Sequence, residues 1–317
     1  MKKMKSVLIT LMVVFILAGL YLATNREKEY SKTQFLLDTT CSLTFYGDES
    51  KEATEAVFEE IKRIENLMSM YNETSDVYRI NNAKAGEEIS VFPDTYEVLR
   101  TAQEIAKESD GAFDITVAPL TTLWNFTAEK PTVPTEEEIG ECLNFVGYEN
   151  IILNDGKVIK TKDEVKIDLG GIAKGYAGDK AKEVAEKFNL TGGIIDLGGN
   201  IICFGENPKN EYKIWRVGIQ TPFSPTGTYE KTIDIKKGAV VTSGNYQRYF
   251  EFGGEIYHHI IDPKTGYPHK ADYDSVTVAT ESSLVADCLA TAVFVTGNEE
   301  LAEKYQGEVY FEKAIKE

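Results

Sequence analysis

Three polar side chains recur at every fourth residue of an otherwise apolar segment, and one of them is a carboxylate. Ser283, Asp287 and Thr291 share one face of residues 282–297, while apolar side chains cover the rest. The pattern predicts a buried helix that ends at Gly297. A buried carboxylate without a partner costs several kcal/mol, so Asp287 must be protonated, paired with a basic side chain or bound to a cation.

The oxygen donors on this face favour a hard cation. A carboxylate and a hydroxyl one helical turn apart, from Asp287 and Thr291, suit Mg²⁺ or Ca²⁺ better than zinc, which normally recruits nitrogen or sulfur. The alternative is structural: a serine that caps the helix and an aspartate that faces a solvent-exposed groove. The segment by itself leaves both interpretations open.

Three glycine-rich turns could present backbone N–H groups to an anion. The first, at 168–179, joins an expected strand to an expected helix, and Lys174 lies one turn into that helix. The others are at 196–200 and 242–246. None is a Walker loop or a dinucleotide-binding fingerprint, and close packing of a strand on a helix would also require such glycines. Three such turns in one chain favour a phosphate-rich ligand.

Two of the three histidines lie together at the start of the segment 257–268, an expected strand that runs into an Asp-Pro-Lys-Thr-Gly turn. On a strand, His258 and His259 point to opposite faces, so at most one of them faces a site. The alternative is a structural histidine at a sheet edge, beside a turn capped by Asp262. Taken alone, the segment favours this alternative.

The elements that must position these residues follow one another without a regular repeat. Apolar spacing predicts further helices over 52–71, 94–109 and 172–188. Asp155-Gly156 between two apolar runs predicts a tight hairpin. Strands are expected after it at 165–169, 192–200, 215–220, 239–242, 248–252, 255–261 and 275–280. Because strands and helices are mixed without regular βαβ units, we predict an α+β fold.

The N-terminus indicates export or membrane anchoring. Basic residues precede an apolar run over 7–23, and this positive flank places the N-terminus on the cytoplasmic side. We expect an anchor or signal segment at 1–24, a polar tether at 25–34 and a folded domain at 35–317 on the outer face of the cell membrane. Leu20 stands where a lipoprotein would need cysteine, so we predict no lipidation.

Charge and cysteine content narrow the functional classes. The formal net charge is −17, from 51 acidic and 34 basic residues, with no basic cluster beyond the N-terminus, which argues against nucleic-acid binding. The four cysteines are far apart and form no CxxC motif. We predict buried free thiols, although one disulfide remains compatible with an oxidising compartment.

Six short motifs occur in one order from about residue 36 to the C-terminus. They lie at 68–71, 111–120 with 123–124, 168–175, 193–200, 259–266 and 286–292. Together they resemble the FAD:protein FMN transferases, the ApbE family. The resemblance implies an α+β fold with a T-fold-like layer, and binding of FAD and Mg²⁺ outside the cytoplasmic membrane. It also implies transfer of FMN to a Thr or Ser of a target protein through a phosphoester bond.

The resemblance also implies roles for individual residues. Asp287 and Thr291 match side-chain ligands of Mg²⁺, with the backbone carbonyl of Gly171 as a further ligand. Positions that match FAD contacts are Leu37, Tyr71, Ala112, Phe113, Asp114, Asp168, Lys174 and Ile261. The chain departs from the family at 37–39, with Leu-Asp-Thr where Met-Gly-Thr is common. The structural alternatives are a core role for Tyr71 and a turn-capping role for Asp114.

The catalytic candidates are His259, Lys174 and Asp287. The resemblance implies that Mg²⁺ and Lys174 neutralise the FAD pyrophosphate while a target hydroxyl attacks the FMN phosphorus and AMP leaves. His259 or a nearby carboxylate could accept the hydroxyl proton. Two alternatives are an FAD pyrophosphatase, in which water replaces the target hydroxyl, and a non-catalytic extracytoplasmic FAD-binding protein.

Overall fold

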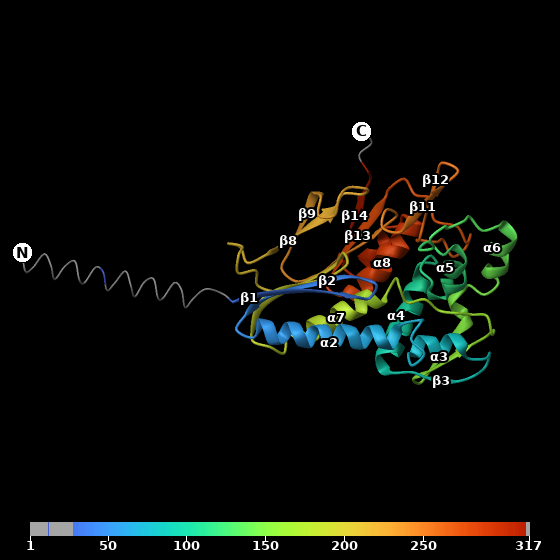
Figure 1. Cartoon of the computed structure of the whole chain (residues 1–317), viewed down its shortest axis with the longest axis horizontal. Helices are drawn as coiled ribbons and strands as arrows, with labels where there is room; N and C mark the ends of the chain where they lie inside the picture. The colour runs from blue at the N-terminus through green and yellow to red at the C-terminus, as the bar shows by residue number, and fades with distance from the viewer. Residues whose placement is uncertain (1–11, 13–27, 315–317) are drawn as a thin grey trace, which may run out of the picture.

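The computed structural model describes residue 12 and residues 28–314 (Figure 1). The expected N-terminal anchor at 1–24 therefore lies, apart from Met12, outside the described residues. Within the described part of the chain, no helix is both long and apolar enough to cross a membrane.

A seven-stranded sheet forms the centre of the molecule, in the order β1-β2-β6-β7-β10-β13-β14. Each neighbouring pair is antiparallel. The strands are β1 Glu29–Leu36, β2 Thr39–Gly47, β6 Leu190–Leu197, β7 Asn200–Gly205, β10 Gly238–Gly244, β13 Ser275–Thr280 and β14 Glu308–Glu312. Together with the helices described next, this sheet confirms the α+β prediction.

Helices pack on one face of the sheet, and a two-stranded ribbon packs on the other. Alternate residues point to opposite faces, so Leu43 and Phe45 of β2 enter the main core while Tyr46 packs on the other side with Trp215. The main core lies beneath α2 Ser50–Met68, α4 Pro93–Glu108, α7 Ala173–Ala185 and α8 Ser283–Thr296. The ribbon of β8 Trp215–Gln220 and β9 Tyr229–Ile235 covers the other face, and Figure 1 shows it on the opposite side of the sheet from α2 and α7.

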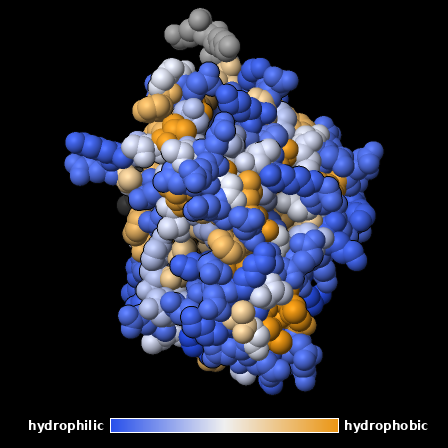
Figure 2. Space-filling model, turned by 90° about the vertical axis from the view of Figure 1, so that its right-hand side faces the viewer, coloured by the Kyte–Doolittle hydropathy of each residue, from blue (hydrophilic) through white to orange (hydrophobic). Residues whose placement is uncertain are grey.

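The smaller elements gather at one end of the molecule, at the right of Figure 1. They are α3 Asp76–Asn82, β3 Ile89–Ser90, η1 Ile115–Val117, α5 Ala118–Trp124, α6 Glu136–Leu143, η2 Tyr148–Asn150, β4 Ile151–Asn154, β5 Lys157–Lys160, β11 Tyr249–Phe252 and β12 Glu255–His258. α9 Glu300–Glu303 precedes β14. Figure 2 shows this end as mostly hydrophilic, with hydrophobic residues in small separate groups. The surface on this side therefore has no extended apolar face.

Several local predictions are confirmed. Asp155 and Gly156 have φ values of 45° and 76° and connect β4 to β5, as expected for a two-residue hairpin turn. Gly297 ends α8 in the left-handed region, with a φ of 67°. The four cysteines are free thiols, and Cys41, Cys203 and Cys288 are buried as predicted, whereas Cys142 is only partly buried.

The prediction of a strand at 165–169 is wrong. Backbone groups of this segment form hydrogen bonds with side chains where a strand would pair with a neighbouring strand. This segment joins no sheet in the described structure. The Ile167 N–H donates to Asn81 Oδ1 at 2.7 Å, and Asn81 Nδ2 donates to the Ile167 carbonyl at 2.9 Å. Lys160 Nζ donates to three backbone carbonyls around the same segment. Its buried alternating side chains imitate the pattern of a strand.

Other boundaries also differ from the expectation, and the strand expected at 255–261 ends at His258, so His259 lies beyond it. The strand expected at 192–200 is two strands, β6 and β7, separated by Gly198 and Gly199, with φ values of 66° and 95°. Residues 29–34, expected within the tether, lie in β1, because pairing with β2 satisfies their backbone groups whatever their side chains. The turn expected at 242–246 starts later, since β10 continues to Gly244.

Candidate functional site

The site lies where α7 and α8 cross, and glycine makes the close crossing possible. A Cβ at Gly175 would lie 2.7 Å from Asp287 Cβ and would overlap the Ser283 carbonyl. The Gly175 N–H donates to Asp287 Oδ2 at 2.8 Å. No side chain of its own segment caps α7. Asp287 of α8 therefore accepts a hydrogen bond from the first turn of α7, where a carboxylate is favourable.

The second oxygen of Asp287 faces a cation. Lys174 Nζ lies 3.7 Å from Asp287 Oδ1 and donates to the Gly170 carbonyl at 3.2 Å. Asp287 is buried, whereas the Lys174 side chain is 25% exposed. Pairing with a basic side chain, one of the three expected solutions for Asp287, is therefore observed, and the base comes from another helix.

The hydroxyl one turn further along α8 meets two other segments. Thr291 Oγ1 lies 3.2 Å from Ser243 Oγ of β10. A Cβ built on Gly171 would lie 3.3 Å from Phe113 Cε2, a tight contact, and 3.8 Å from Thr291 Oγ1, an ordinary van der Waals contact. The structure thus brings together Gly171, Thr291, Asp287 and Phe113. Ser243 lies in the glycine-rich segment singled out at 242–246, but its contact with α8 could not be predicted, because the two segments are far apart in the chain.

Two neighbouring serines at the start of α8 have different roles. Ser283 Oγ is buried without a hydrogen-bond partner in the described structure, and it lies at the α7 crossing, 2.9 Å from a Cβ built on Gly178. The N-cap is Ser282, whose hydroxyl accepts the Val285 N–H. A capping serine is therefore present, but it is not part of the repeating polar face.

The donor set fits a hard cation. Oxygen atoms of one carboxylate, Asp287, and of hydroxyls at Thr291 and Ser243 lie on adjacent segments. Within the described residues there is no group of three or more His, Cys, Asp or Glu that could hold a metal. A cation here would rely on neutral oxygens, water and a phosphate ligand, which is how Mg²⁺ is usually bound and is unlike a zinc site.

Two further predicted residues, Asp168 and Asp114, make local hydrogen bonds. Asp168 Oδ1 accepts the Gly170 N–H at 2.8 Å, and its Oδ2 accepts the Thr121 hydroxyl at 3.2 Å. These bonds hold the glycine turn that precedes α7. Asp114 Oδ1 accepts the N–H and hydroxyl of Thr116, at 2.7 and 2.6 Å, and burial raises its pKa. The structural alternative for Asp114, a turn cap, is thus observed.

The two adjacent histidines have different surroundings. His258 Nε2 lies 2.8 Å from the His269 carbonyl, and its ring contacts Phe294 edge-on. His259 follows β12, and its buried Nδ1 has no hydrogen-bond partner in the described structure. Burial lowers the pKa of His259 to about 3, with further lowering from His258, Arg248 and Lys174. His259 is therefore a neutral imidazole close to the cations of the site.

The remaining predicted contacts are spread around the site. Tyr71 is 85% exposed, so the alternative of a core tyrosine is wrong. Leu37 has a φ of 54°, and its N–H donates to Glu65 Oε1 at 2.7 Å. Ala112 is buried in the main core, and Ile261 is buried beside Trp124. The last two offer little side-chain surface, so a ligand would meet them through the backbone.

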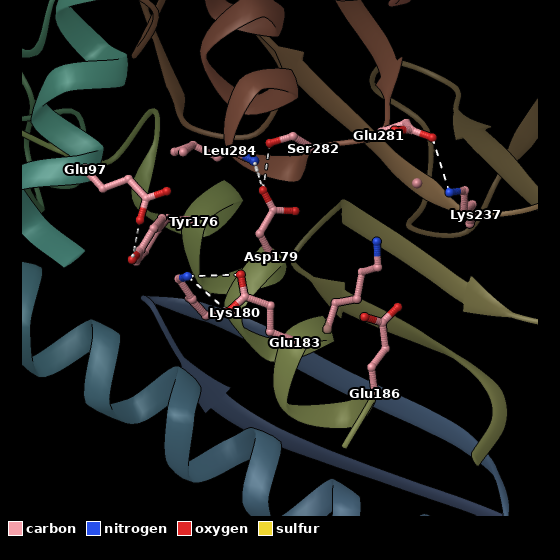
Figure 3. Close-up of a pocket in the computed structure, with 12 residues that line it drawn as sticks. Glu97, Tyr176, Asp179, Lys180, Glu183, Glu186, Lys237, Glu281, Ser282 and Leu284 are labelled. Carbon is pink, nitrogen blue, oxygen red and sulfur yellow. Dashed lines mark hydrogen bonds and ion pairs between the residues drawn. The ribbon is translucent and has the colours of Figure 1, made fainter. Parts of the chain in front are cut away.

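A cleft lies apart from these residues, at the N-terminal end of α8 (Figure 3). It has a volume of about 320 Å³, and its charged side chains include two ion pairs, Lys180 with Glu183 and Lys237 with Glu281. Asp179 accepts hydrogen bonds from Ser282 and from two backbone N–H groups of α8. Because these contacts already use several of the charged groups of the cleft, we place the site at Lys174 and Asp287.

Fold and site together define a class of α+β protein in which a glycine turn lies beside a buried carboxylate and a lysine. The model of the ApbE family matches residues 37–311. The chain belongs to the ApbE family, as the motifs predicted.

The relatives described here are named FAD:protein FMN transferase or ApbE. The FAD:protein FMN transferase of Haemophilus influenzae is 35% identical, covering 98% of this chain and 93% of that protein. The FAD:protein FMN transferase of Treponema pallidum is 32% identical, covering 86% and 80%. Among solved structures, the ApbE protein of Thermotoga maritima superposes with a TM-score of 0.82 at 35% identity, covering 90% of this chain and 97% of that one. The flavin transferase ApbE of Vibrio cholerae gives 0.78 at 28% identity, with 90% and 93% covered.

Proposed function

We propose that this enzyme transfers FMN from FAD to a Thr or Ser hydroxyl of a target protein outside the cytoplasmic membrane, with Mg²⁺ as cofactor and release of AMP. The observation that carries the proposal is the arrangement around Asp287. One carboxylate, one lysine and the Thr291 hydroxyl meet beside the glycine turn at 168–171. The relatives named as FAD:protein FMN transferases support the choice of substrate.

The residues present can perform each step of such a transfer. Asp287, Thr291 and the Gly171 carbonyl would hold Mg²⁺, which supplies charge neutralisation at the pyrophosphate when bound. Lys174 adds a positive charge at the same place. The target hydroxyl oxygen forms a bond to the FMN phosphorus, the bond from that phosphorus to the bridging oxygen breaks, and AMP leaves. We assign acceptance of the hydroxyl proton to His259, which is neutral and whose Nδ1 has no hydrogen-bond partner within the described structure.

The decisive test is a product assay on the full-length protein. It is incubated with FAD, Mg²⁺ and a candidate extracytoplasmic electron-transfer protein that carries an exposed Thr. We expect yellow fluorescence that stays on the acceptor after denaturation, with AMP released in equal amount. An acceptor Thr→Val variant is the control, since it lacks the attacking oxygen.

The same assay separates the two alternative functions. FMN and AMP without any adduct would support an FAD pyrophosphatase, and FAD binding without AMP would support a carrier. The candidate metal ligands Asp287 and Thr291, which lie one turn apart on α8, argue against the carrier, because storage of FAD needs no metal at the pyrophosphate. The membrane location is tested separately, by digestion of the protein on intact cells with an added protease.

A further inference from the structure

Arg248 is a cation near the site to which the proposed function assigns no role. It precedes β11, and its carbonyl accepts the His259 N–H at 3.1 Å. Its Nη2 donates to Asp38 Oδ2 at 2.7 Å and to the Asp38 carbonyl at 3.3 Å. The two side chains are 46% and 74% exposed, so a ligand could reach both.

Asp38 presents its oxygens from a constrained turn. Leu37 and Asp38, with φ values of 54° and 56°, form the two-residue connection between β1 and β2. Aspartate tolerates this left-handed conformation better than most residues. The Leu37 N–H is bound to Glu65, which fixes the turn against α2. The Asp38 carboxylate is therefore held in a defined place opposite Arg248.

The negative charge of a bound pyrophosphate would require a second cation in addition to Lys174. Lys174 faces Asp287 at 3.7 Å, so the two charges largely offset each other. Each phosphate of a pyrophosphate diester carries a negative charge, and the chain itself has a formal net charge of −17. Arg248 lies on the segment next to His259, since its carbonyl accepts the His259 N–H. Arg248 is therefore a second cation whose backbone is hydrogen-bonded to His259.

We propose that Arg248 binds the pyrophosphate of FAD, and that Asp38 holds the guanidinium in place until substrate replaces it. This inference rests on FAD as the substrate of the proposed function. A guanidinium suits the role because its forked N–H groups can bind two phosphate oxygens at once. Asp38 and FAD then compete for the Arg248 guanidinium. Removal of the Arg248 charge should therefore weaken FAD binding, whereas removal of the Asp38 charge should strengthen it.

The test compares three ligands by calorimetric titration of the full-length protein in Mg²⁺. FAD contains flavin and pyrophosphate, ADP contains the pyrophosphate without flavin, and riboflavin contains the flavin without phosphate. For Arg248→Gln we expect the Kd for FAD and ADP to rise about tenfold, with riboflavin unchanged. For Asp38→Asn, which keeps the turn but removes the charge, we expect the Kd for FAD to fall about threefold.

The matched control is Arg216→Gln. Arg216 makes a similar exposed pair with Asp234, at 2.7 and 2.8 Å, on the β8–β9 ribbon that covers the other face of the sheet. The Arg216→Gln variant should bind FAD, ADP and riboflavin as the wild type does. The melting temperatures of the Arg248 and Arg216 variants show whether both are folded.

Four results would overturn the inference. One is an Arg248→Gln variant that binds FAD and ADP as tightly as the wild type. A second is an equal loss of riboflavin binding, because Arg248 would then support the flavin pocket or the fold. A third is an Asp38→Asn variant that weakens FAD binding, which would make the pair a positioning unit. Failure of the wild type to bind FAD would overturn the proposed function as well, whereas the first three results leave it intact.

Discussion

At the scale of single residues, Asp287 uses its two oxygens differently. Oδ2 accepts the Gly175 N–H, while Oδ1 faces Lys174 from 3.7 Å, longer than a hydrogen bond. The first contact ties two helices together, and the second leaves an oxygen that a cation could take. Structural and catalytic roles can therefore be separated by a substitution that keeps one oxygen and removes the charge.

Asp287→Asn should keep the fold but lose metal binding. Its amide oxygen can still accept the Gly175 N–H, whereas the only carboxylate among the candidate ligands is gone. We expect transfer activity to fall by about two orders of magnitude and Mg²⁺ affinity to drop at least tenfold, as measured by calorimetric titration. Thr291→Ser, which keeps a hydroxyl, is the control. Unchanged Mg²⁺ binding by Asp287→Asn would refute the metal assignment.

Lys174→Gln should impair both substrate binding and turnover. Its positive charge would act on the pyrophosphate in the ground state and in the transition state, so KM for FAD should rise and kcat should fall, each about tenfold. Steady-state kinetics measure both constants. Lys180→Gln, also on α7 but paired with Glu183, is the matched control and should behave as the wild type. If the two variants were equally active, the anion site would lie elsewhere.

At the scale of elements, the α7–α8 crossing determines the geometry of the site. Gly175 and Gly178 bring the two helices so close that a Cβ at either position would meet atoms of α8 within 3 Å. α8 packs on β10 and β13 as well as on α7, so it cannot shift without disturbing the core of the sheet. The distance between Lys174 and Asp287 is thus determined by helix packing.

Gly175→Ala should destabilise the protein by about 1–3 kcal/mol, because the new methyl overlaps α8 and forces the helices apart. Urea unfolding measures this loss, and FAD binding should weaken in parallel. Gly140→Ala in α6 is the control, since a Cβ there meets no atom within 4 Å. Alanine is the better helix former, so this variant should gain up to about 1 kcal/mol. Equal stability of the two variants would contradict a tight crossing.

At the scale of the whole molecule, buried histidines link folding to pH. Burial lowers the pKa of His258 to about 4 and that of His259 to about 3, against about 6.5 in an unfolded chain. At pH values between the folded-state pKa and the unfolded-state pKa of each histidine, the unfolded state binds more protons than the folded state. The stabilising contribution is therefore fully present above pH 6.5 and is lost as the pH falls towards 4.

We expect the free energy of unfolding to decrease from pH 6.5 to pH 5, measured by urea titration. In His258→Asn this slope should be shallower, since one of the groups that take up protons on unfolding is removed. His269→Asn is a useful comparison, because His269 is only partly buried, whereas His258 is buried. Identical slopes in the wild type and in His258→Asn would show that His258 is not protonated differently in the two states.

The sequence by itself determined the local features of this protein. The four-residue spacing of Asp287 and Thr291 follows from the helical period, so both had to lie on one face of any helix there. The Asp155-Gly156 hairpin and the end of α8 at Gly297 also depend only on local backbone preferences. The order of six motifs was enough to predict the family, the α+β fold and a glycine turn next to a lysine.

Only the tertiary structure decided which residues meet. Gly175 and Asp287 are 112 residues apart, and Asp38 and Arg248 are 210 residues apart. Neither contact leaves a periodic trace in the chain. The segment 165–169 has the alternation of a strand, yet the side chains of Asn81 and Lys160 satisfy its backbone groups in place of a partner strand. Backbone propensity acts over a few residues, whereas these contacts follow from how the helices pack across the sheet.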